Sequence, residues 1–364
     1  MVLQDLGEWM RPLDAWMHPS TESPPSLETC SSVGKRLGNV LASVHCDATL
    51  LLKSRTLADD GKAWFENPAT KDLVREEIVK KVFPILQPRI DPETDRAEKI
   101  ARIISQDFDH GFLETLHPSS SHAPVVQQSM FSMGDLWTGS IIVGASPTAS
   151  SSNPSFGATE VEVGLIDWEF ASPARIGQDI AQLSAWLHLF STSSTWSSTE
   201  PRFRRVAANT IVTRPTQSVG IDRFGAAVGE PLGSRSPAGT LMDALLETYG
   251  RKVKEYPGYL WFVDEDYDQR KFKNERLAVI RSIWILFGRE VIRNSVEAGD
   301  RFVRSFTVDA DGGGGEEMKV WQKEMIQVGC WYVSVAGESS DDEFEEVVRR
   351  ERMLKTMYTV SGSL

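Results

Sequence analysis

Hydrophobic residues recur at helical spacing over most of the chain. Residues 31–45 follow the i, i+4, i+7, i+8 pattern of an amphipathic helix that ends at His45. Residues 71–87 and 95–106 predict two more helices, separated by a proline-bearing break. Two later stripes have the same periodicity: Leu277, Ile280, Trp284, Phe287 and Val291, and then Phe344, Val347, Val348, Leu354 and Tyr358. The pattern therefore predicts a mostly helical chain.

A different pattern occupies residues 129–170. Ile141–Val143 and Val161–Ile166 are rich in β-branched residues and flank a serine-rich loop, which predicts an antiparallel hairpin. The two ends of such a hairpin would bring Asp135 and Asp167 together. Beyond it, residues 177–190 predict an apolar helix, and residues 191–240 predict a low-complexity or poorly ordered insertion.

Composition and charge exclude several classes of protein. The 364 residues, 41% hydrophobic and 25% charged, are typical of a globular protein with a sizeable core. A formal charge of −12 without a basic stripe argues against a nucleic-acid partner, because such proteins gather Lys and Arg to contact phosphates. Three cysteines without a CxxC pair argue against a disulfide framework and favour a reducing, cytoplasmic compartment. The sequence predicts neither a signal peptide nor a membrane span.

Several common nucleotide-binding and hydrolase motifs are missing from the sequence. It contains no Walker A loop, no GxGxxG turn and no GxSxG elbow. The run Gly312–Gly315 is flanked by acidic residues instead of a lysine, so we interpret it as a flexible linker. These observations argue against dinucleotide-binding, P-loop and α/β-hydrolase functions.

The candidate chemistry lies on either side of the hairpin. Asp135 stands on a glycine-flanked turn, five residues before Ser140, while Asp167 and Glu169 alternate with bulky apolar residues at the end of a strand. A period of two predicts that Asp167 and Glu169 point to the same side. Such oxygen ligands suit Mg²⁺ and phosphates, and phosphoryl transfer also uses a carboxylate to accept the proton of the attacking hydroxyl. On spacing alone, an ordinary turn and an exposed strand end remain an alternative.

These motifs resemble those of the aminoglycoside phosphotransferase and choline kinase-like family, which shares its plan with protein kinases. The family's catalytic loop reads HGDxxxxN, and residues 133–140 read MGDLWTGS. Its metal motif, IDxE, follows a hairpin and matches residues 166–169, and a later helix carrying an Asp matches GQDIA at residues 177–181. The forms that these motifs take in this sequence are most similar to those of methylthioribose kinases and fungal hydroxytryptamine-type kinases.

The resemblance implies a role for each matching residue. Asp135 would be the catalytic base, and Asp179 would brace the catalytic loop by hydrogen bonds. Asp167 would be the main Mg²⁺ ligand, with Glu169 as a further carboxylate of the metal site and Ser140 as an uncharged oxygen ligand. The implied cofactors are ATP and Mg²⁺, and the implied partner is a small-molecule hydroxyl acceptor such as a sugar or an amino alcohol.

The start of the chain departs from the family's pattern. Residues 2–7 look like the hinge strand of these kinases, where backbone groups near Gln4, Asp5 and Leu6 would hydrogen-bond adenine. If they are the hinge, the N-terminal β-lobe that covers the nucleotide and supplies a lysine is absent or truncated. Because that lobe provides electrostatic stabilisation and excludes water, we expect the chain as written to be a poor kinase.

The expected architecture is therefore α+β, a protein-kinase-like C-lobe that is mostly helical and carries its active site on a short antiparallel hairpin. Residues 1–30 would form a hinge-like strand and linker, residues 31–190 the catalytic core, and residues 241–364 a helical C-terminal subdomain. The expected function is ATP-dependent O-phosphotransfer to a small hydroxylated metabolite. The alternatives are a pseudokinase or regulatory binding module and, less favoured without a nearby His ligand, a metal-dependent hydrolase.

Overall fold

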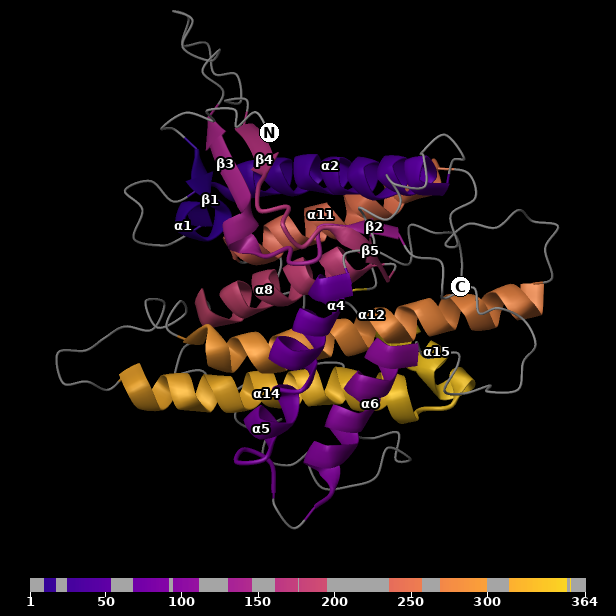
Figure 1. Ribbon diagram of the computed structural model, residues 1–364. Coiled ribbons are helices and arrows are strands. Elements are labelled where there is room, and N and C mark those ends of the chain that lie inside the picture. The colour runs from indigo at the N-terminus through magenta and orange to yellow at the C-terminus, as the bar shows by residue number, and fades with distance from the viewer. Residues whose placement is uncertain are drawn as a thin grey trace, which may run out of the picture.

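The computed structural model describes residues 10–17, 25–53, 68–91, 94–110, 130–145, 161–175, 177–194, 236–256, 269–299, 314–351 and 354. It is mostly helical with a small amount of antiparallel sheet, so the α+β class is confirmed (Figure 1). The expected hinge residues Gln4, Asp5 and Leu6 lie outside the described residues.

Two small sheets flank the candidate motifs in sequence. β1 (Arg11–Pro12), β3 (Ile141–Ala145) and β4 (Val161–Leu165) pair in that order, and β3 and β4 are antiparallel with Ile141 opposite Leu165. The predicted hairpin is thereby confirmed. β2 (Met130–Ser132) pairs with β5 (Ser172–Ala174) in a second antiparallel sheet, which the short segments gave no pattern to predict.

The strand pairing fixes two loops beside each other. Residues 133–140 connect β2 to β3, and residues 166–171 connect β4 to β5. Because β2 pairs with β5 and β3 pairs with β4, the two connections start and end at paired strands. They must therefore run side by side between the two sheets.

A long helix, α2 (Leu27–Lys53), lies against α11 (Pro237–Lys254) (Figure 1). The predicted helix, residues 31–45, was too short at both ends. The Ser26 hydroxyl accepts a hydrogen bond from the Thr29 backbone N–H at 3.1 Å and so supports an earlier start. Cys46 and Thr49 are buried, so the apolar face continues past His45.

Five shorter elements of the described chain lie between β1 and β2 in sequence, apart from α2. They are α1 (Leu13–Met17), α4 (Pro68–Val74), the π-helical turn η1 (Arg75–Val79), α5 (Val82–Leu86) and α6 (Arg96–His110). The single helix expected over residues 71–87 is thus interrupted. Pro84 has no N–H to donate to the carbonyl of Lys80, so that helical hydrogen bond is missing. In the preceding turn, the Lys80 N–H donates to Arg75 O at 3.0 Å, five residues back.

The predicted insertion, residues 191–240, was wrong at both ends. α8 (Gln178–Ser194) continues through the serine-rich stretch, and α11 begins at Pro237 behind an N-cap at Ser236. The hydroxyls of Thr192 and Ser193 donate to carbonyls of their own helix, at 2.9 Å and 3.2 Å, so these polar residues are buried without unsatisfied groups. Residues 195–235 lie outside the described residues.

Helices α12 (Gln269–Glu297) and α14 (Gly314–Glu338) pack along each other, and α8 lies on the other side of α12 (Figure 1). The predicted stripe from Leu277 to Val291 is buried throughout. α15 (Asp341–Arg350) buries the predicted Phe344, and Tyr358 lies outside the described residues. Gly314 and Gly315 begin α14, so the expected linker ends within a helix.

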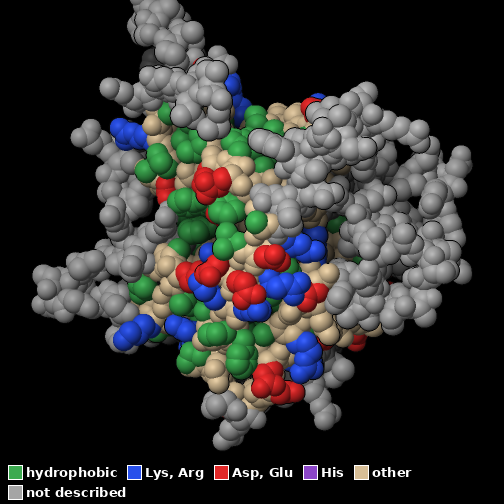
Figure 2. Space-filling model, viewed as in Figure 1, with side chains coloured by type: hydrophobic (Ala, Val, Ile, Leu, Met, Phe, Trp, Pro, Cys, Tyr) green, Lys and Arg blue, Asp and Glu red, His purple; other side chains and the backbone are tan. Residues whose placement is uncertain are grey.

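The face in Figure 2 carries Lys and Arg side chains interspersed with Asp and Glu over the region of α4 and α6. Two ion pairs join η1 to the two residues that follow it. They have i, i+4 spacing: Lys80 with Glu76 at 2.5 Å, and Lys81 with Glu77. Both pairs are more than 45% exposed, so solvent screens them and each contributes little to stability. Within the described part of the chain, no helix combines the length and apolar character needed to cross a membrane.

The contact between α2 and α11 requires a glycine at position 34. A Cβ there would lie 2.3 Å from the backbone oxygen of Leu241, which no side-chain movement can relieve. We therefore expect Gly34→Ala to lower the free energy of unfolding by roughly 1–3 kcal/mol, measured by denaturant titration. Asn39→Ala, at an exposed position of the same helix, is the control and should change it by less than about 0.5 kcal/mol. An unchanged Gly34→Ala would contradict the close approach.

Candidate functional site

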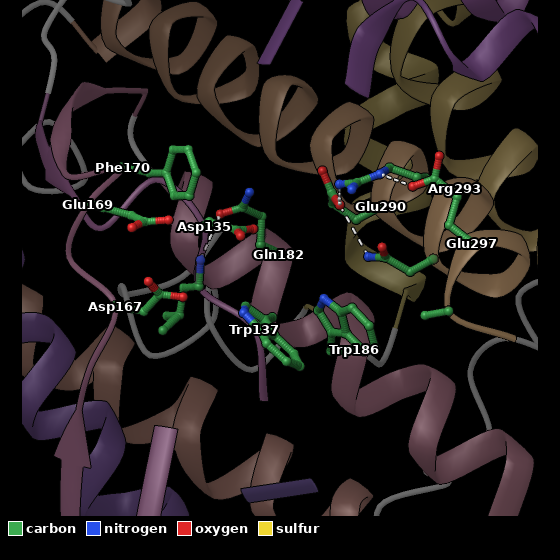
Figure 3. A pocket seen from close by; sticks show the side chains of 13 residues that line it. Asp135, Trp137, Asp167, Glu169, Phe170, Gln182, Trp186, Glu290, Arg293 and Glu297 are labelled. Atoms are coloured by element: carbon green, nitrogen blue, oxygen red, sulfur yellow. Dashed lines mark hydrogen bonds and ion pairs between the residues drawn. The ribbon is translucent and has the colours of Figure 1, made fainter. Parts of the chain in front are cut away.

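The two adjacent loops bring the predicted carboxylates to one cavity of about 450 Å³. Asp135 comes from the β2–β3 connection, and Asp167 and Glu169 come from the β4–β5 connection. Figure 3 shows these three side chains on one side of the cavity and side chains of α12 across from them. The lining residues are Asp135, Leu136, Trp137, Asp167, Glu169, Phe170, Gln182, Trp186, Glu290, Arg293, Asn294, Glu297 and Ala298.

The two loops approach each other closely at Gly134. Its φ of +86° lies in the left-handed region, and a Cβ there would lie 2.3 Å from the backbone oxygen of Phe170. Asp167 also has a positive φ, of 70°, which is uncommon for a residue with a side chain. β4 ends at Leu165, so the expected strand alternation does not extend to Asp167 and Glu169. They line the same cavity because the chain turns, not because of a period of two.

Asp179, in the first turn of α8, holds the β2–β3 connection by hydrogen bonds. Its Oδ1 accepts from the Ser132 hydroxyl at 2.5 Å and from the Gly134 N–H at 3.1 Å. Its Oδ2 accepts from the Met133 N–H at 2.7 Å. Asp179 is fully buried, and its carboxylate contacts residues 132–134.

A buried histidine supports Asp179 from behind. His45 lies on α2, with Nε2 2.9 Å from Asp179 Oδ2 and Nδ1 3.0 Å from the Tyr249 hydroxyl of α11. A ring that carries a proton on Nε2 donates to the carboxylate, and its Nδ1 lies within hydrogen-bonding distance of the phenol. Burial raises the pKa of Asp179, but the hydrogen bond and electrostatic attraction of His45, together with the hydrogen bonds from Ser132 and Met133, outweigh it, and the pKa lies below its ordinary value.

Asp135 has the opposite electrostatic environment. Burial raises its pKa to about 6, and the negative charge of Glu290 on α12 acts in the same direction. Arg293 opposes that shift, while Asp167 and Asp179 add to it. A carboxylate with a pKa near 6 is mostly ionised at neutral pH and is more basic than an ordinary Asp, which suits a general base.

Ser140 is not among the residues that line the cavity. Its side chain is 1% exposed, and its hydroxyl donates to Trp137 O at 2.8 Å and accepts from Trp137 N at 3.1 Å. The hydroxyl is thus used to close the turn that ends the loop. Its expected role as a metal ligand is not supported by this arrangement.

The far wall of the cavity consists of polar residues of α12 that the sequence analysis missed. Glu290, Arg293, Asn294 and Glu297 stand at i, i+3, i+4 and i+7, a polar stripe at the end of the helix that could have indicated a functional face. Arg293 Nε donates to Glu297 Oε2 at 2.6 Å, and Asn294 Nδ2 donates to Glu290 Oε2 at 3.2 Å. The buried Glu290 also pairs with Arg289 at 2.5 Å.

Aromatic residues form the remaining side of the cavity. The rings of Trp137 and Trp186 are 5.7 Å apart at an angle of 42°, and both line the cavity. Trp186 stands on α8 four residues after Gln182, another lining residue that was missed. Because Gln182 is three residues from Asp179, helical spacing places it one turn along the same face, and that spacing could have found it.

The donor set can be compared with the needs of Mg²⁺. Within the described residues, no group of three or more His, Cys, Asp or Glu side chains is close enough to hold a metal ion on its own. Mg²⁺ in phosphoryl-transfer sites is held by one or two carboxylates together with water and substrate phosphates. Asp167 and Glu169, exposed at the cavity, fit that smaller requirement.

Comparison with known proteins gives no family assignment: no protein-family model matches the chain, and no curated protein matches its sequence.

Asp179 and Asp243 lie in contrasting environments, so we expect replacement by Asn to change the free energy of unfolding in opposite directions at the two positions. In Asp179→Asn an amide NH₂ would replace an oxygen that accepts N–H or O–H donors, so we expect a loss of about 2–4 kcal/mol in the free energy of unfolding at pH 7. Since the folded pKa of Asp179 is depressed, its contribution is present above the ordinary pKa of 3.8 and is lost as the pH falls further.

Asp243→Asn is the matched control for this prediction. Burial and the neighbouring Glu247 raise the pKa of Asp243 to about 6, so its ionised form destabilises the fold. We expect Asp243→Asn to stabilise the protein at pH 7, with the gain disappearing as the pH falls through 6 towards 4. Denaturant titrations at pH 7 and pH 4 measure both variants, and a shift of the same sign in both at pH 7 would contradict the account.

Proposed function

We propose that the chain is an ATP-dependent O-phosphotransferase of the aminoglycoside phosphotransferase-like type, acting on a small hydroxylated metabolite through a kinase-like C-lobe. One observation carries the proposal: Asp135, Asp167 and Glu169 meet at one cavity from two adjacent loops, with the loop of Asp135 held by a buried Asp179. The three cysteines are buried as thiols, which supports a reducing, cytoplasmic setting.

Asp135 is the proposed general base. Its carboxylate accepts the proton of the acceptor hydroxyl while that oxygen forms a bond to the γ-phosphorus of ATP. The bond between the γ-phosphorus and its bridging oxygen breaks, and ADP leaves with the electron pair. The raised pKa of Asp135 strengthens it as a base while leaving it ionised at neutral pH.

Asp167 and Glu169 are the proposed ligands for Mg²⁺, which, when bound, neutralises charge on the phosphate oxygens. Their position on the β4–β5 connection places them on the same side of the cavity as Asp135. The adenine contacts proposed for Gln4, Asp5 and Leu6 fall outside the described residues. Within the described residues, the proposed nucleotide contacts are therefore those that Asp167 and Glu169 make through Mg²⁺ to the phosphates.

The acceptor is proposed to lie between Asp135 and α12. That space is bordered by the rings of Trp137 and Trp186 and by the polar stripe of Glu290, Arg293, Asn294 and Glu297. Its volume of about 450 Å³ falls in the range of small-molecule sites. Aromatic faces with alternating donors and acceptors suit a sugar or an amino alcohol, whose hydroxyls need both.

The experiment that tests the proposal is transfer of the γ-phosphate of Mg-ATP to a panel of sugars and amino alcohols. Asp135→Asn should reduce kcat about 10²–10⁴-fold, because proton acceptance is lost while the shape of the side chain is kept. Asp47→Asn, an exposed substitution on α2, is the control and should leave kcat unchanged. Equal kcat values for Asp135→Asn and the wild type would contradict the assignment of Asp135 as the general base.

The pH dependence of kcat/KM gives a second test, of the electrostatics. A base must be deprotonated to act, so activity should fall as the pH drops through about 6. Glu290→Gln removes a charge that raises the pKa of Asp135 and should move the midpoint down, whereas Arg293→Gln removes a charge that lowers it and should move the midpoint up. Midpoints that move in the same direction, or not at all, would contradict the role of Asp135.

A further inference from the structure

Gln182 holds the peptide groups on both sides of Asp135. Its Nε2 donates to the carbonyl of Gly134 at 3.1 Å, and its Oε1 accepts from the N–H of Leu136 at 3.4 Å. A carbonyl can only accept and a backbone N–H can only donate, so these contacts fix which way the carboxamide faces. One side chain thus contacts the residues immediately before and after the proposed base.

The side chain of Gln182 is itself held firmly. It is 3% exposed and projects from α8, whose interior positions are buried, and it lines the cavity beside Asp135. The carboxamide uses both its donor and its acceptor on the same loop, which a buried amide needs in order to offset its desolvation. Figure 3 shows Gln182 directed at the loop from the side opposite Asp167 and Glu169.

Asp179 and Gln182 divide the loop between them. Asp179 contacts residues 132–134, and Gln182 contacts residues 134 and 136, so their contacts meet at Gly134. Gly134 is also the point where φ is +86° and the second loop comes closest. Gln178, one turn before Gln182, donates to the same carbonyl at the longer distance of 3.4 Å. Asp179 therefore fixes where the loop starts, and Gln182 fixes the segment that carries the carboxylate.

We propose that Gln182 is a positioning residue that sets the direction of the Asp135 carboxylate by clamping the peptide groups on either side of it. The proposal rests on the proposed function of Asp135 as the general base. Gln182 touches the base through the backbone and takes no part in bond making. Its importance follows from geometry, since a displacement of about 1 Å in a reacting group can reduce a rate about 100-fold.

The test compares Gln182→Met with Ser184→Ala in the full-length chain. Met has a similar length but neither hydrogen-bonding group, so both contacts of the clamp are lost. Ser184 is a buried residue of the same helix whose hydroxyl has no hydrogen-bond partner within the described residues, which makes it the matched control. With Mg-ATP and the acceptor panel, Gln182→Met should lower kcat about 10–100-fold with the KM for ATP unchanged, and Ser184→Ala should change neither.

A second measurement does not depend on turnover. Hydrogen–deuterium exchange of the peptide covering residues 132–140 should be faster in Gln182→Met than in the wild type and unchanged in Ser184→Ala, because the N–H of Leu136 loses its acceptor. Unchanged exchange in folded Gln182→Met would overturn the clamp. Faster exchange with normal kcat would also overturn the positioning role, since the contacts would then be only structural.

The two measurements separate failure of this inference from failure of the proposed function. If the wild type transfers no phosphate to any acceptor, the proposed function fails, and exchange still decides whether Gln182 clamps the loop. If Gln182→Met does not fold, Gln182→Leu replaces it, because Leu also lacks both the donor for Gly134 and the acceptor for Leu136. Normal exchange and normal kcat in folded Gln182→Leu would overturn the proposal.

Discussion

A carboxylate buried away from water must have its charge balanced by hydrogen bonds from the protein, and Asp179 meets that requirement within one loop and one histidine. Its two oxygens accept from Ser132, Met133, Gly134 and His45. The position of the candidate site depends on these contacts, since the loop that carries Asp135 has no regular secondary structure over most of its length. Its shape is fixed by α8, and α8 is fixed by the core.

The same constraint links distant parts of the chain. His45 lies on α2 and contacts Tyr249 on α11, so the support behind Asp179 depends on the close packing of these two helices. That packing depends in turn on Gly34, where a Cβ would meet the backbone of α11. Gly34, which does not line the cavity, therefore supports the site through the packing of α2 against α11 and the buried contacts of His45.

Much of this arrangement could be predicted from the sequence. The hairpin, the helix carrying Asp179 and the meeting of Asp135 with Asp167 follow from β-branched runs, apolar periodicity and acidic motifs of fixed spacing. The contribution of α12 did not follow, because Glu290 and Arg293 reach the cavity only through the tertiary packing of a helix more than a hundred residues away. The role of His45 depends likewise on two partners 134 and 204 residues distant in sequence.

Local errors have physical causes of the same kind. Residues 191–194 were predicted to begin a low-complexity or poorly ordered insertion because hydroxyl groups usually favour solvent, yet Thr192 and Ser193 donate hydrogen bonds to their own helix and are buried. Strand alternation was extended to Asp167 and Glu169, although the chain leaves the strand before them with a positive φ. Ser140 was assigned to metal by motif position, but its hydroxyl closes a turn at Trp137. In each case a specific hydrogen bond or dihedral angle decided the outcome.

The central claim is that this cavity binds a nucleotide through carboxylates that hold its metal ion. Isothermal titration of the 364-residue chain with ATP, in the presence and absence of Mg²⁺ and alongside Asp167→Ala, tests it most directly. The account predicts binding that requires Mg²⁺ and is weakened or lost in folded Asp167→Ala. An absence of binding at millimolar ATP by the folded wild type, or binding that is indifferent to both Mg²⁺ and Asp167, would contradict it.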